Sequence, residues 1–438
     1  MSERAAFVRA IRENLADDAP RLIAADWFEE HGQETRAEFI RVQVEAACLS
    51  PYEQRLVELN GRATTLERRH ERTWQPTLRD MATERVYRRG FVECAAVSAD
   101  RFAANYPALF ALEPLSEIVV AQPRSRLPQL TACQGLLQLE GLNFSNTGIG
   151  AAYCRTFFGS SYLHQLRKLD VSRNHLGSRG VRAIVNARLD CLTELVMTQN
   201  LRIIRQPNLF RTNGLRNLKK LDLSQNRFPW ESLDSLPEAS FWPTLEVLDL
   251  SSNPVAYHLP ELFAGMRSVN LRELTLSDCD LLDAHFDQTF VPHRFAHLEK
   301  LTVASNQHLT SQLLRFLADE RRFPALRQLE VILQDVRYYY RPQYQPEDIE
   351  AASMFAESKV MANLTSLTAN PTEIWLEALA NTNNAKKLEK LSLTRAVVGE
   401  DYLRRFVERA ELPELREMTI NVGYSRNTIA LETLSGAE

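Results

Sequence analysis

The chain has 438 residues, of which 45% are hydrophobic and 25% are charged, and its formal net charge is −4. This balance is typical of an ordinary soluble protein, and it argues against a general nucleic-acid binder or a surface attracted to anionic lipid. No uninterrupted apolar run approaches the length of about 18 residues that a membrane-spanning helix needs. The six cysteines form no Cys-x-x-Cys pair and no secretory signal precedes them, so we expect reduced thiols in a cytoplasmic protein.

Residues 1–47 are predicted to form a small unit of three helices. Phe7, Ile11 and Leu15 recur once per helical turn, and Asp18 and Pro20 then fit the cap and first turn of a second helix. The third helix is expected over residues 36–47. The predicted apolar faces of the second and third helices are made of Leu22, Ile23, Trp27 and Phe28, and of Phe39, Ile40 and Val44.

Two neighbouring residues of this unit, Asp26 and Trp27, have an ordinary structural interpretation. We expect Trp27 to fill the small three-helix core and Asp26 to accept a hydrogen bond from an arginine such as Arg41. Because so short a unit buries little apolar surface by itself, it is also expected to dock on the segment that follows.

Residues 48–88 are predicted to be a helical linker. Residues 50–53 have the form of a capping box, and the stretch 62–89 is rich in arginine with glutamate and aspartate interleaved. A nucleic-acid patch would be more purely basic and would carry aromatic residues free to stack. We therefore interpret these arginines as partners in ion pairs within the helix.

Residues 89–135 are predicted to be an irregular N-terminal cap for the array that follows. Arg89 and Gly90 form a turn, residues 91–97 read as a strand, and residues 100–110 read as a helix. Leu115, Ile118 and Val120 then show the apolar spacing of the later units without their asparagine. Such a cap closes the otherwise open core of a repeat array.

Residues 136–426 repeat the pattern Leu-x-x-Leu-x-Leu-x-x-Asn, as in residues 218–226, and successive units begin at Leu192, Leu218 and Leu245. A period in this range with this signature predicts a leucine-rich-repeat solenoid of the α/β class, with a curved parallel inner sheet and outer helices. The alternating residues form the strand, and most returning segments read as amphipathic helices. The tail, residues 427–438, contains no further repeat.

The asparagine of each unit stands where the chain turns away from the strand. Its side-chain amide can bond the buried backbone groups of its own turn and of the neighbouring turn. We expect a structural ladder of these side chains, with Cys279 occupying one place in it, formed by Asn174, Asn200, Asn226, Asn253 and Asn306.

Residues 18–27 (Asp-Ala-Pro-Arg-Leu-Ile-Ala-Ala-Asp-Trp), 29–32 and 37–43 resemble the repeat-companion domain at the N-terminus of many bacterial leucine-rich-repeat proteins. The Arg-Gly-Phe-Val-Glu stretch at residues 89–93 is familiar in the same proteins. This resemblance implies a bacterial origin and a two-part architecture, and it implies no activity. The repeat units themselves resemble the ribonuclease-inhibitor-like class.

The sequence contains no motif that predicts a reaction. Gly-x-Ser-x-Gly and phosphate-loop patterns are absent, and His293 and His297 are read as loop residues without further ligands at metal-binding spacing. We expect no enzyme activity, no cofactor and no metal. Nothing in the sequence indicates an oligomeric state.

Two places are candidates for partner binding. The first is the concave face, where solenoids bind and where acidic residues recur between the two strand leucines. The second is an insertion of tyrosines and arginine, residue types that interfaces favour. The candidate residues are Asp170, Asp222, Asp249 and Glu330 on the concave face, and Tyr338, Tyr339, Tyr340, Arg341 and Tyr344 in the insertion.

The sequence therefore predicts a non-enzymatic scaffold that binds a protein partner on its concave face. A basic partner is expected there, because the candidate stripe is acidic. The alternative is an adaptor or regulatory subunit, in which residues 1–47 recruit an enzyme and the repeats select its target. Neither hypothesis includes nucleic acid or a membrane.

Overall fold

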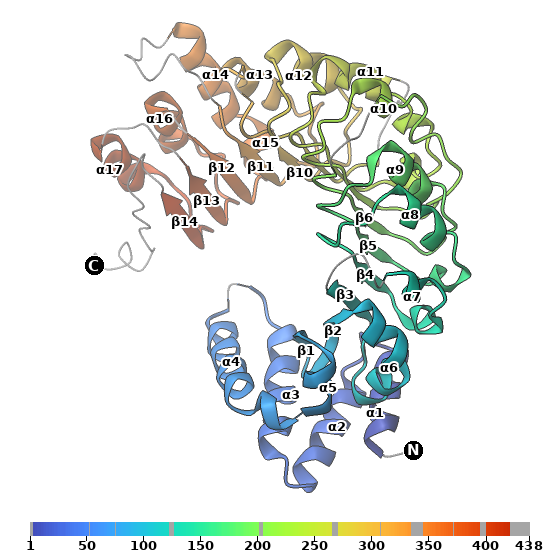
Figure 1. Cartoon of the computed structure of the whole chain (residues 1–438). Coiled ribbons are helices and arrows are strands. Elements are labelled where there is room, and N and C mark those ends of the chain that lie inside the picture. Colours follow the sequence, from blue (N-terminus) through green and yellow to red (C-terminus); the bar gives the residue numbers. More distant parts are fainter. Residues whose placement is uncertain are drawn as a thin grey trace. The chain divides into compact units, whose positions relative to one another are not determined.

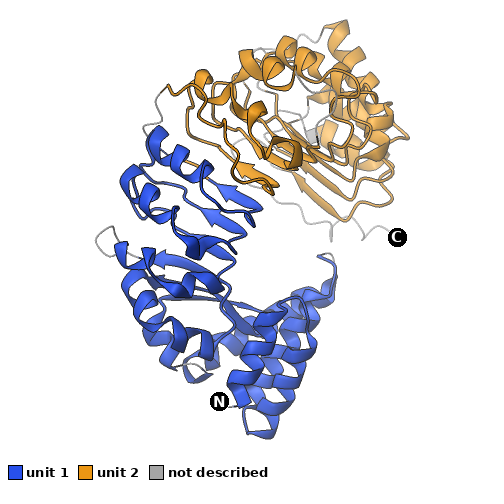
Figure 2. Ribbon diagram, turned by 90° about the vertical axis from the view of Figure 1, so that its right-hand side faces the viewer, with its two compact units in different colours: residues 1–196, 200–202 blue, residues 197–199, 203–438 orange. Residues whose placement is uncertain are grey.

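The computed structural model describes residues 3–51, 53–74, 76–121, 127–200, 205–264, 270–306, 308–333, 345–370, 372–394 and 400–420. The chain divides into two compact units, one of residues 1–196 and 200–202 and one of residues 197–199 and 203–438 (Figure 2). Within the described residues, no helix is long and apolar enough to cross a membrane.

Unit 1 contains a sheet with helices along one of its faces (Figure 1). Its first two strands are antiparallel and each later strand is parallel to the one before it. The strands are β1 (Glu84–Arg88), β2 (Phe91–Ser98), β3 (Glu117–Ala121), β4 (Gly141–Asn143), β5 (Lys168–Asp170) and β6 (Glu194–Val196).

The helices of unit 1 fall into two groups. Five precede the first strand, and the others alternate with strands, as expected for returning segments. They are α1 (Glu3–Glu13), α2 (Ala19–Glu30), α3 (Glu34–Ala47), α4 (Gln54–Trp74), α5 (Pro76–Met81), α6 (Ala99–Leu112), α7 (Pro128–Thr131), α8 (Ala151–Phe157) and α9 (Gly177–Val185), with 3₁₀ turns η2 (Gln134–Gln138) and η3 (Ser161–Leu163).

The predicted apolar face of α2 is wrong for Leu22 and Ile23 and is confirmed for Phe28. The helix turns Ala24, Ala25 and Phe28 into the core, whereas Leu22 is 39% exposed and Ile23 is 57% exposed. The reason is Arg21, which lies on the same helical side as Phe28 and pairs with a buried glutamate of β2. An inward Arg21 fixes the rotation of α2 and leaves Ile23 outside.

Trp27 is not the centre of the helical core, contrary to the prediction. It is half-buried at the edge of the cluster, its ring stacks on His31 at a centroid distance of 4.2 Å, and its Nε1 donates to Glu3 at 2.8 Å. Phe28 is the buried aromatic residue of α2. The predicted bond from Arg41 to Asp26 is confirmed, at 2.7 Å.

The helical block docks on the first two strands, as expected. Phe91 of β2 belongs to the same buried cluster as Ile11, Phe28 and Ile40 of the helices. Arg21 Nη2 donates to Glu93 Oε1 of β2 at 2.6 Å, and both side chains are buried. Helix and strand are therefore parts of one core.

The turn between β1 and β2 requires glycine at its second position. Arg89 and Gly90 both have positive φ, at 48° and 87°, which is the geometry of a tight hairpin turn. A Cβ atom on Gly90 would lie 2.5 Å from Ile40 Cγ1, and the amide of Gly90 donates to Gln43 Oε1 at 2.7 Å. The sequence did not predict β1, because its Glu, Arg and Tyr residues read as the end of a charged helix.

Unit 2 repeats strand and returning segment throughout (Figure 1). All its described strand pairs are parallel. The strands are β7 (Lys220–Asp222), β8 (Val247–Asp249), β9 (Glu273–Thr275), β10 (Lys300–Thr302), β11 (Gln328–Val331), β12 (Ser366–Ala369), β13 (Lys390–Leu393) and β14 (Glu417–Ile420).

The returning segments of unit 2 are short helices and turns, and two helices occupy the longer interval between β11 and β12. They are α10 (Trp230–Leu233), α11 (Leu259–Ala264), α12 (Asp283–Thr289), α13 (Gln312–Leu317), α14 (Pro346–Ala356), α15 (Lys359–Asn363), α16 (Glu373–Asn381) and α17 (Glu400–Arg409), with 3₁₀ turns η4 (Leu236–Glu238), η5 (Trp242–Thr244) and η6 (Ala256–His258).

The central leucine of each repeat is in register with that of the next repeat. In unit 2 this buried row begins with Leu221, Leu248, Leu274 and Leu301. One repeat cannot bury its own apolar residues, so the neighbouring repeats pack against it and bury them.

The ladder asparagines bond backbone groups on both sides of their own turn. Asn253 is 1% exposed; its Nδ2 donates to the carbonyl oxygens of Leu223, Leu250 and Ser251, and its Oδ1 accepts from the amide of Phe228 at 3.0 Å. The residue before each ladder position has a left-handed backbone that most L-residues avoid. These residues are Arg173, Gln199, Gln225, Ser252, Asp278 and Ser305.

Cys279 occupies the ladder place between Asn253 and Asn306. Its Sγ lies 3.4 Å from the carbonyl oxygens of Leu250 and Ser277, so the thiol reproduces part of the donor role. In the preceding repeat, the amide of Phe228 bonds the side chain of Asn253. At the equivalent place beside Cys279, whose thiol is a weak acceptor, the amide of Val255 bonds the backbone carbonyl of Asn253 at 2.8 Å instead. Burial raises the pKa of Cys279 to about 12.

We expect Asn253→Ala to lower the free energy of unfolding by about 1–3 kcal/mol, because several buried backbone groups lose their partner. Urea titration followed by circular dichroism measures the change. The same substitution at Asn60, which is exposed on α4, is the control. Equal losses for the two variants would contradict a structural role for the ladder.

Candidate binding face

The face of each sheet opposite the helices, here called the open sheet face, carries the residue that follows the central buried residue of each repeat strand. This residue is polar in most strands and valine in β3 and β6. Asp222 and Asp249 are Cα partners on β7 and β8, and Thr275 follows on β9. In unit 1, Asp170 is the Cα partner of Asn143 on one side and of Val196 on the other. The open sheet face is the one that the sequence assigns to partner binding.

Charges near the start of the strands are largely neutralised across neighbouring repeats. Lys219 Nζ lies 2.9 Å from Glu246 Oε1, and Lys390 Nζ lies 2.8 Å from Glu417 Oε1. Arg272 and Glu299 form a further pair of this kind. Adjacent parallel strands are about 4.8 Å apart, so side chains in the same position meet directly. These pairs leave the central column as the more distinctive acidic feature.

Asp222 and Asp249 stand side by side and each also bonds its own strand. Oδ1 of Asp222 accepts from the amide of Ser224 at 2.9 Å, and Oδ1 of Asp249 accepts from the amide of Ser251 at 2.8 Å. Asp170 bonds the amide of Ser172 at 2.8 Å in the same way. The aspartate of a Leu-Asp-Leu-Ser strand therefore has a local structural role.

The pKa of Asp222 is raised above its ordinary value. Burial is the main cause, bonds from Ser224 oppose it, and the negative charge of Asp249 adds to it. The negative charge of Asp249 disfavours the charged form of Asp222. A positive group placed over them would reverse that effect.

Glu330 is separate from the aspartate pair. It lies on β11 between Thr302 and Thr368, three strands beyond Asp249. Each strand adds about 4.8 Å, so this carboxylate is too distant to act with Asp249 on one side chain of a partner. The structure thus brings Asp222 and Asp249 together, and it leaves Glu330 apart.

Unit 1 has a charged bridge on its open sheet face. Glu117 of β3 accepts from Arg88 of β1 at 3.0 Å and from Lys168 of β5 at 2.9 Å. The bridge passes over Gly141 of β4, where a Cβ atom would lie 2.4 Å from Glu117 Cγ. Burial raises the pKa of Glu117, but the bonds from Arg88 and Lys168 outweigh it and leave the pKa below its ordinary value.

A hollow of about 300 Å³ lies beside this bridge. Its lining includes Cys94, Val119, Asp170 and Val196, and Glu194 completes its acidic side. Asp170 Oδ2 accepts from Asn143 Nδ2 at 3.1 Å. Gly141 and Asn143 are small for strand positions, and this is a weak sequence signal for the hollow.

The second candidate, Tyr338, Tyr339, Tyr340, Arg341 and Tyr344, lies outside the described residues. Among the described residues, no three His, Cys, Asp or Glu side chains gather as a metal site would require. The insertion remains a hypothesis from the sequence.

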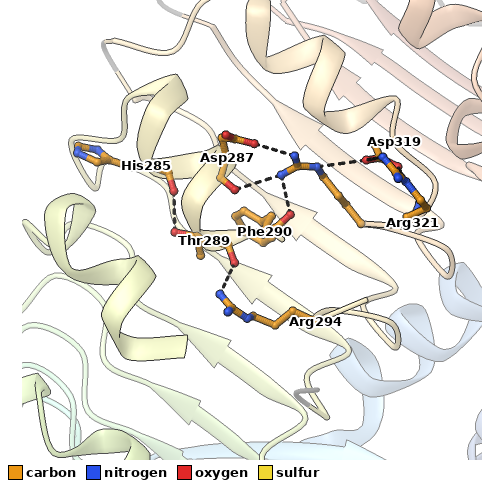
Figure 3. A network of polar contacts seen from close by, with 8 residues as sticks. His285, Asp287, Thr289, Phe290, Arg294, Asp319 and Arg321 are labelled. Atoms are coloured by element: carbon orange, nitrogen blue, oxygen red, sulfur yellow. Dashed lines mark hydrogen bonds and ion pairs between the residues drawn. The ribbon is translucent and has the colours of Figure 1, made fainter. Parts of the chain in front are cut away.

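A dense polar network around α12 in unit 2 is structural (Figure 3). Arg322 donates to the carbonyl oxygens of Asp287 and Phe290 at 3.1 and 2.8 Å, and its Nη2 donates to Asp287 Oδ1 at 2.7 Å. Arg294 donates to the carbonyl of Thr289 at 3.0 Å. Cations commonly satisfy the free carbonyl groups at the C-terminal end of a helix.

Family models describe part of the chain as leucine-rich repeats, over residues 162–185 and over residues 217–239 and 244–266. The chain carries leucine-rich repeats. The matched segments contain the strands β5, β7 and β8 that bear Asp170, Asp222 and Asp249. No curated protein matches the chain.

Solved structures with a related fold have low sequence identity to these leucine-rich repeats. An internalin (inlF) from Listeria monocytogenes is 14% identical, with a TM-score of 0.40, and the match covers 78% of this chain and 88% of that one. A chain of the yeast Rad7 and Elc1 complex is 15% identical, with a TM-score of 0.48 and coverage of 98% and 96%. Human 5T4 is 18% identical, with a TM-score of 0.31 and coverage of 53% and 70%. Similarity at this level bears on neither partner nor activity.

Proposed function

We propose that the chain is a non-enzymatic scaffold that binds a basic protein partner on the open sheet face of its leucine-rich repeats. The observation that carries this proposal is the side-by-side placement of Asp222 and Asp249 on β7 and β8. Both carboxylates are half-buried, and the pKa of Asp222 is raised, first by burial. A lysine or arginine of a partner would stabilise both charges at once.

The contrast with neighbouring charges supports the choice of this pair. Glu246 and Glu299 are bonded to Lys219 and Arg272 of neighbouring repeats. A partner would have to displace those cations before it could use either glutamate. Within the described residues, no ion pair joins a lysine or arginine to Asp222 or Asp249, although the charge of Lys220 acts on Asp222.

We expect the double variant Asp222→Asn and Asp249→Asn to bind a lysine-rich peptide about tenfold more weakly than the parent at low salt. Asparagine keeps the acceptor that bonds Ser224 and Ser251, so the fold should be preserved. Slower association should cause most of the loss, because charges steer encounter. Fluorescence anisotropy and stopped-flow mixing measure the two quantities.

The matched control is Glu246→Gln with Glu299→Gln, which removes an equal number of negative charges from unit 2 at different positions. This control should bind nearly as well as the parent. An equal loss of peptide affinity in both variants would show that only the net charge of the protein matters. That result would refute Asp222 and Asp249 as a binding site. Since the pKa of Asp222 is raised, binding should also weaken as the pH falls through that pKa, before ordinary aspartates protonate.

We also propose that residues 1–47 are a repeat-companion domain of a bacterial, cytoplasmic protein. Residues of the helical block that carry this resemblance contact the Arg-Gly-Phe-Val-Glu stretch at residues 89–93. Arg21 bonds Glu93, Gln43 accepts from the amide of Gly90, and Asp18 lies 3.6 Å from Arg89. The motif residues of the helical block thus support its docking on the Arg-Gly-Phe-Val-Glu segment.

A further inference from the structure

The arginines of helix α4 fall into two groups. Arg55 bonds Glu45 and Glu58 at 3.0 and 3.1 Å, and Arg62 bonds Glu38 at 2.6 Å. Arg68, Arg69 and Arg72, called here the α4 patch, are exposed, and no ion pair or side-chain hydrogen bond involves them within the described residues. The prediction that arginines in this stretch form ion pairs within the helix is therefore wrong for these three. It is also wrong for Arg62 and Arg85, which pair with Glu38 of α3 and, from β1, with Glu71.

The helix itself cannot neutralise the α4 patch. Side chains on a helix meet their neighbours three and four residues away. For these three arginines such neighbours are chiefly threonine, leucine or another patch arginine, and the only acidic one is Glu71. Glu71 accepts instead from Arg85 Nε of β1 at 2.6 Å.

The geometry of the α4 patch concentrates positive charge. Arg68 and Arg72 are one helical turn apart, which is about 6 Å along the axis, and Arg69 is three residues from Arg72. Leu59, Ala63 and Leu66 form the buried side of the helix, so Arg68 and Arg72 point to the solvent side. Like charges at this spacing destabilise a helix unless an anion lies between them.

We propose that the α4 patch binds an acidic segment of a protein partner. Two carboxylates spaced by one helical turn would match Arg68 and Arg72, and the planar guanidinium group favours paired hydrogen bonds to a carboxylate. This surface lies in unit 1 and is opposite in charge to the aspartate pair of unit 2. The inference stands independently of the proposed function, and it adds a second partner of opposite charge.

The surroundings of the patch favour protein over nucleic acid as the ligand. Nucleic-acid surfaces combine phosphate-binding cations with aromatic side chains free to stack on bases. Trp74, at the end of α4, is 7% exposed and packs against Phe39 at a ring-centroid distance of 4.9 Å. His70 is half-buried and stacks on the same tryptophan. The α4 patch has no free aromatic partner among these neighbours.

The test uses the full chain and a fluorescein-labelled helical peptide with glutamate at every fourth position. Fluorescence anisotropy at low salt should show binding by the parent and none by a glutamine version of the peptide. Arg68→Gln with Arg72→Gln should weaken binding about tenfold, the loss expected for two charge-assisted contacts. Arg55→Gln with Arg62→Gln removes the same charge from the same helix and should change binding less than about twofold.

Three outcomes would overturn the proposal. They are equal weakening in the two double variants, no binding of the acidic peptide by the parent, and tighter patch-dependent binding of a DNA duplex. A second measurement on the parent needs no variant. The peptide should protect Arg68 and Arg72 from phenylglyoxal more than it protects Arg79, which is exposed on the next helix. Uniform protection of all three arginines would count against the patch.

Discussion

Replacing Glu113 with glutamine is expected to lower the free energy of unfolding by about 3–5 kcal/mol, as for other broken buried ion pairs. Glu113 is 0% exposed and lies 3.6 Å from Arg36, which is 1% exposed. Its Oε2 also accepts from the amide of Val92 at 2.8 Å. Without the negative charge, the guanidinium of Arg36 would lose this buried carboxylate and stay buried among Phe28, Phe39, Trp74, Tyr87 and Phe91.

Urea titration of the full chain measures this loss, and Glu38→Gln is the matched control. Glu38 pairs with Arg62 at the surface, so its change should cost no more than about 1 kcal/mol. Replacing both partners, as Arg36→Met with Glu113→Leu, should recover part of the stability, because the uncompensated buried charge is gone and the remaining loss is the acceptor of the Val92 amide. A small effect of Glu113→Gln, similar to that of Glu38→Gln, would show that the buried pair does not hold the block to the strands.

Phe28→Ala is expected to loosen the helical block far more than Trp27→Ala. Loss of a core phenylalanine costs about 3–5 kcal/mol, and Phe28 is 2% exposed. Trp27 keeps one side in solvent and contacts Phe7 and His31 at the edge of the cluster. Hydrogen exchange of the α1–α3 amides distinguishes the two variants.

Phe91 of β2 shares the core with Phe28, so the effect of Phe28→Ala should extend to β2 amides. Amides of unit 2 serve as the internal reference and should keep their protection. If Trp27→Ala lowered the protection of the α1–α3 amides as much as Phe28→Ala does, Trp27 would be a core residue of the helical block after all.

The repeat architecture could be predicted from residues alone because each unit repeats the same local requirement. Leu221 and Leu223 point inward and Asp222 points outward, and this alternation defines a strand. The asparagine marks the turn, and the fixed period requires stacking. These signals are local and recur, so variation in one unit, such as Cys279, does not hide the pattern.

The helical block was harder to predict because its polar residues are inside. Arg21 and Arg36 are buried, and a rule that places charges outside rotates α2 incorrectly. Their partners lie far away in sequence; Arg21 and Glu93 are 72 residues apart. No local pattern shows such a contact.

The candidate site was predictable only in part. The register of Asp222 and Asp249 follows from the repeat period, and the structure has them in register. The bridge from Arg88 through Glu117 to Lys168 depends on β1, a strand that the sequence did not reveal, and on the missing side chain of Gly141. Arg68, Arg69 and Arg72 remain without an acidic partner because Glu71 accepts from Arg85 of β1. This is a tertiary contact, which a local sequence pattern does not reveal.

Cys279 gives the array an internal reporter. Its thiol is 0% exposed, and the raised pKa keeps it protonated near neutral pH, so alkylating reagents cannot react with it while the repeats stay closed. Reaction requires the rung between Asn253 and Asn306 to open and expose the sulfur. Cys48 and Cys191 are exposed thiols that react first, so the alkylation rate of Cys279 is followed on its own peptide by mass spectrometry. That rate is a direct measure of the local opening equilibrium in the middle of unit 2, obtained without any introduced label.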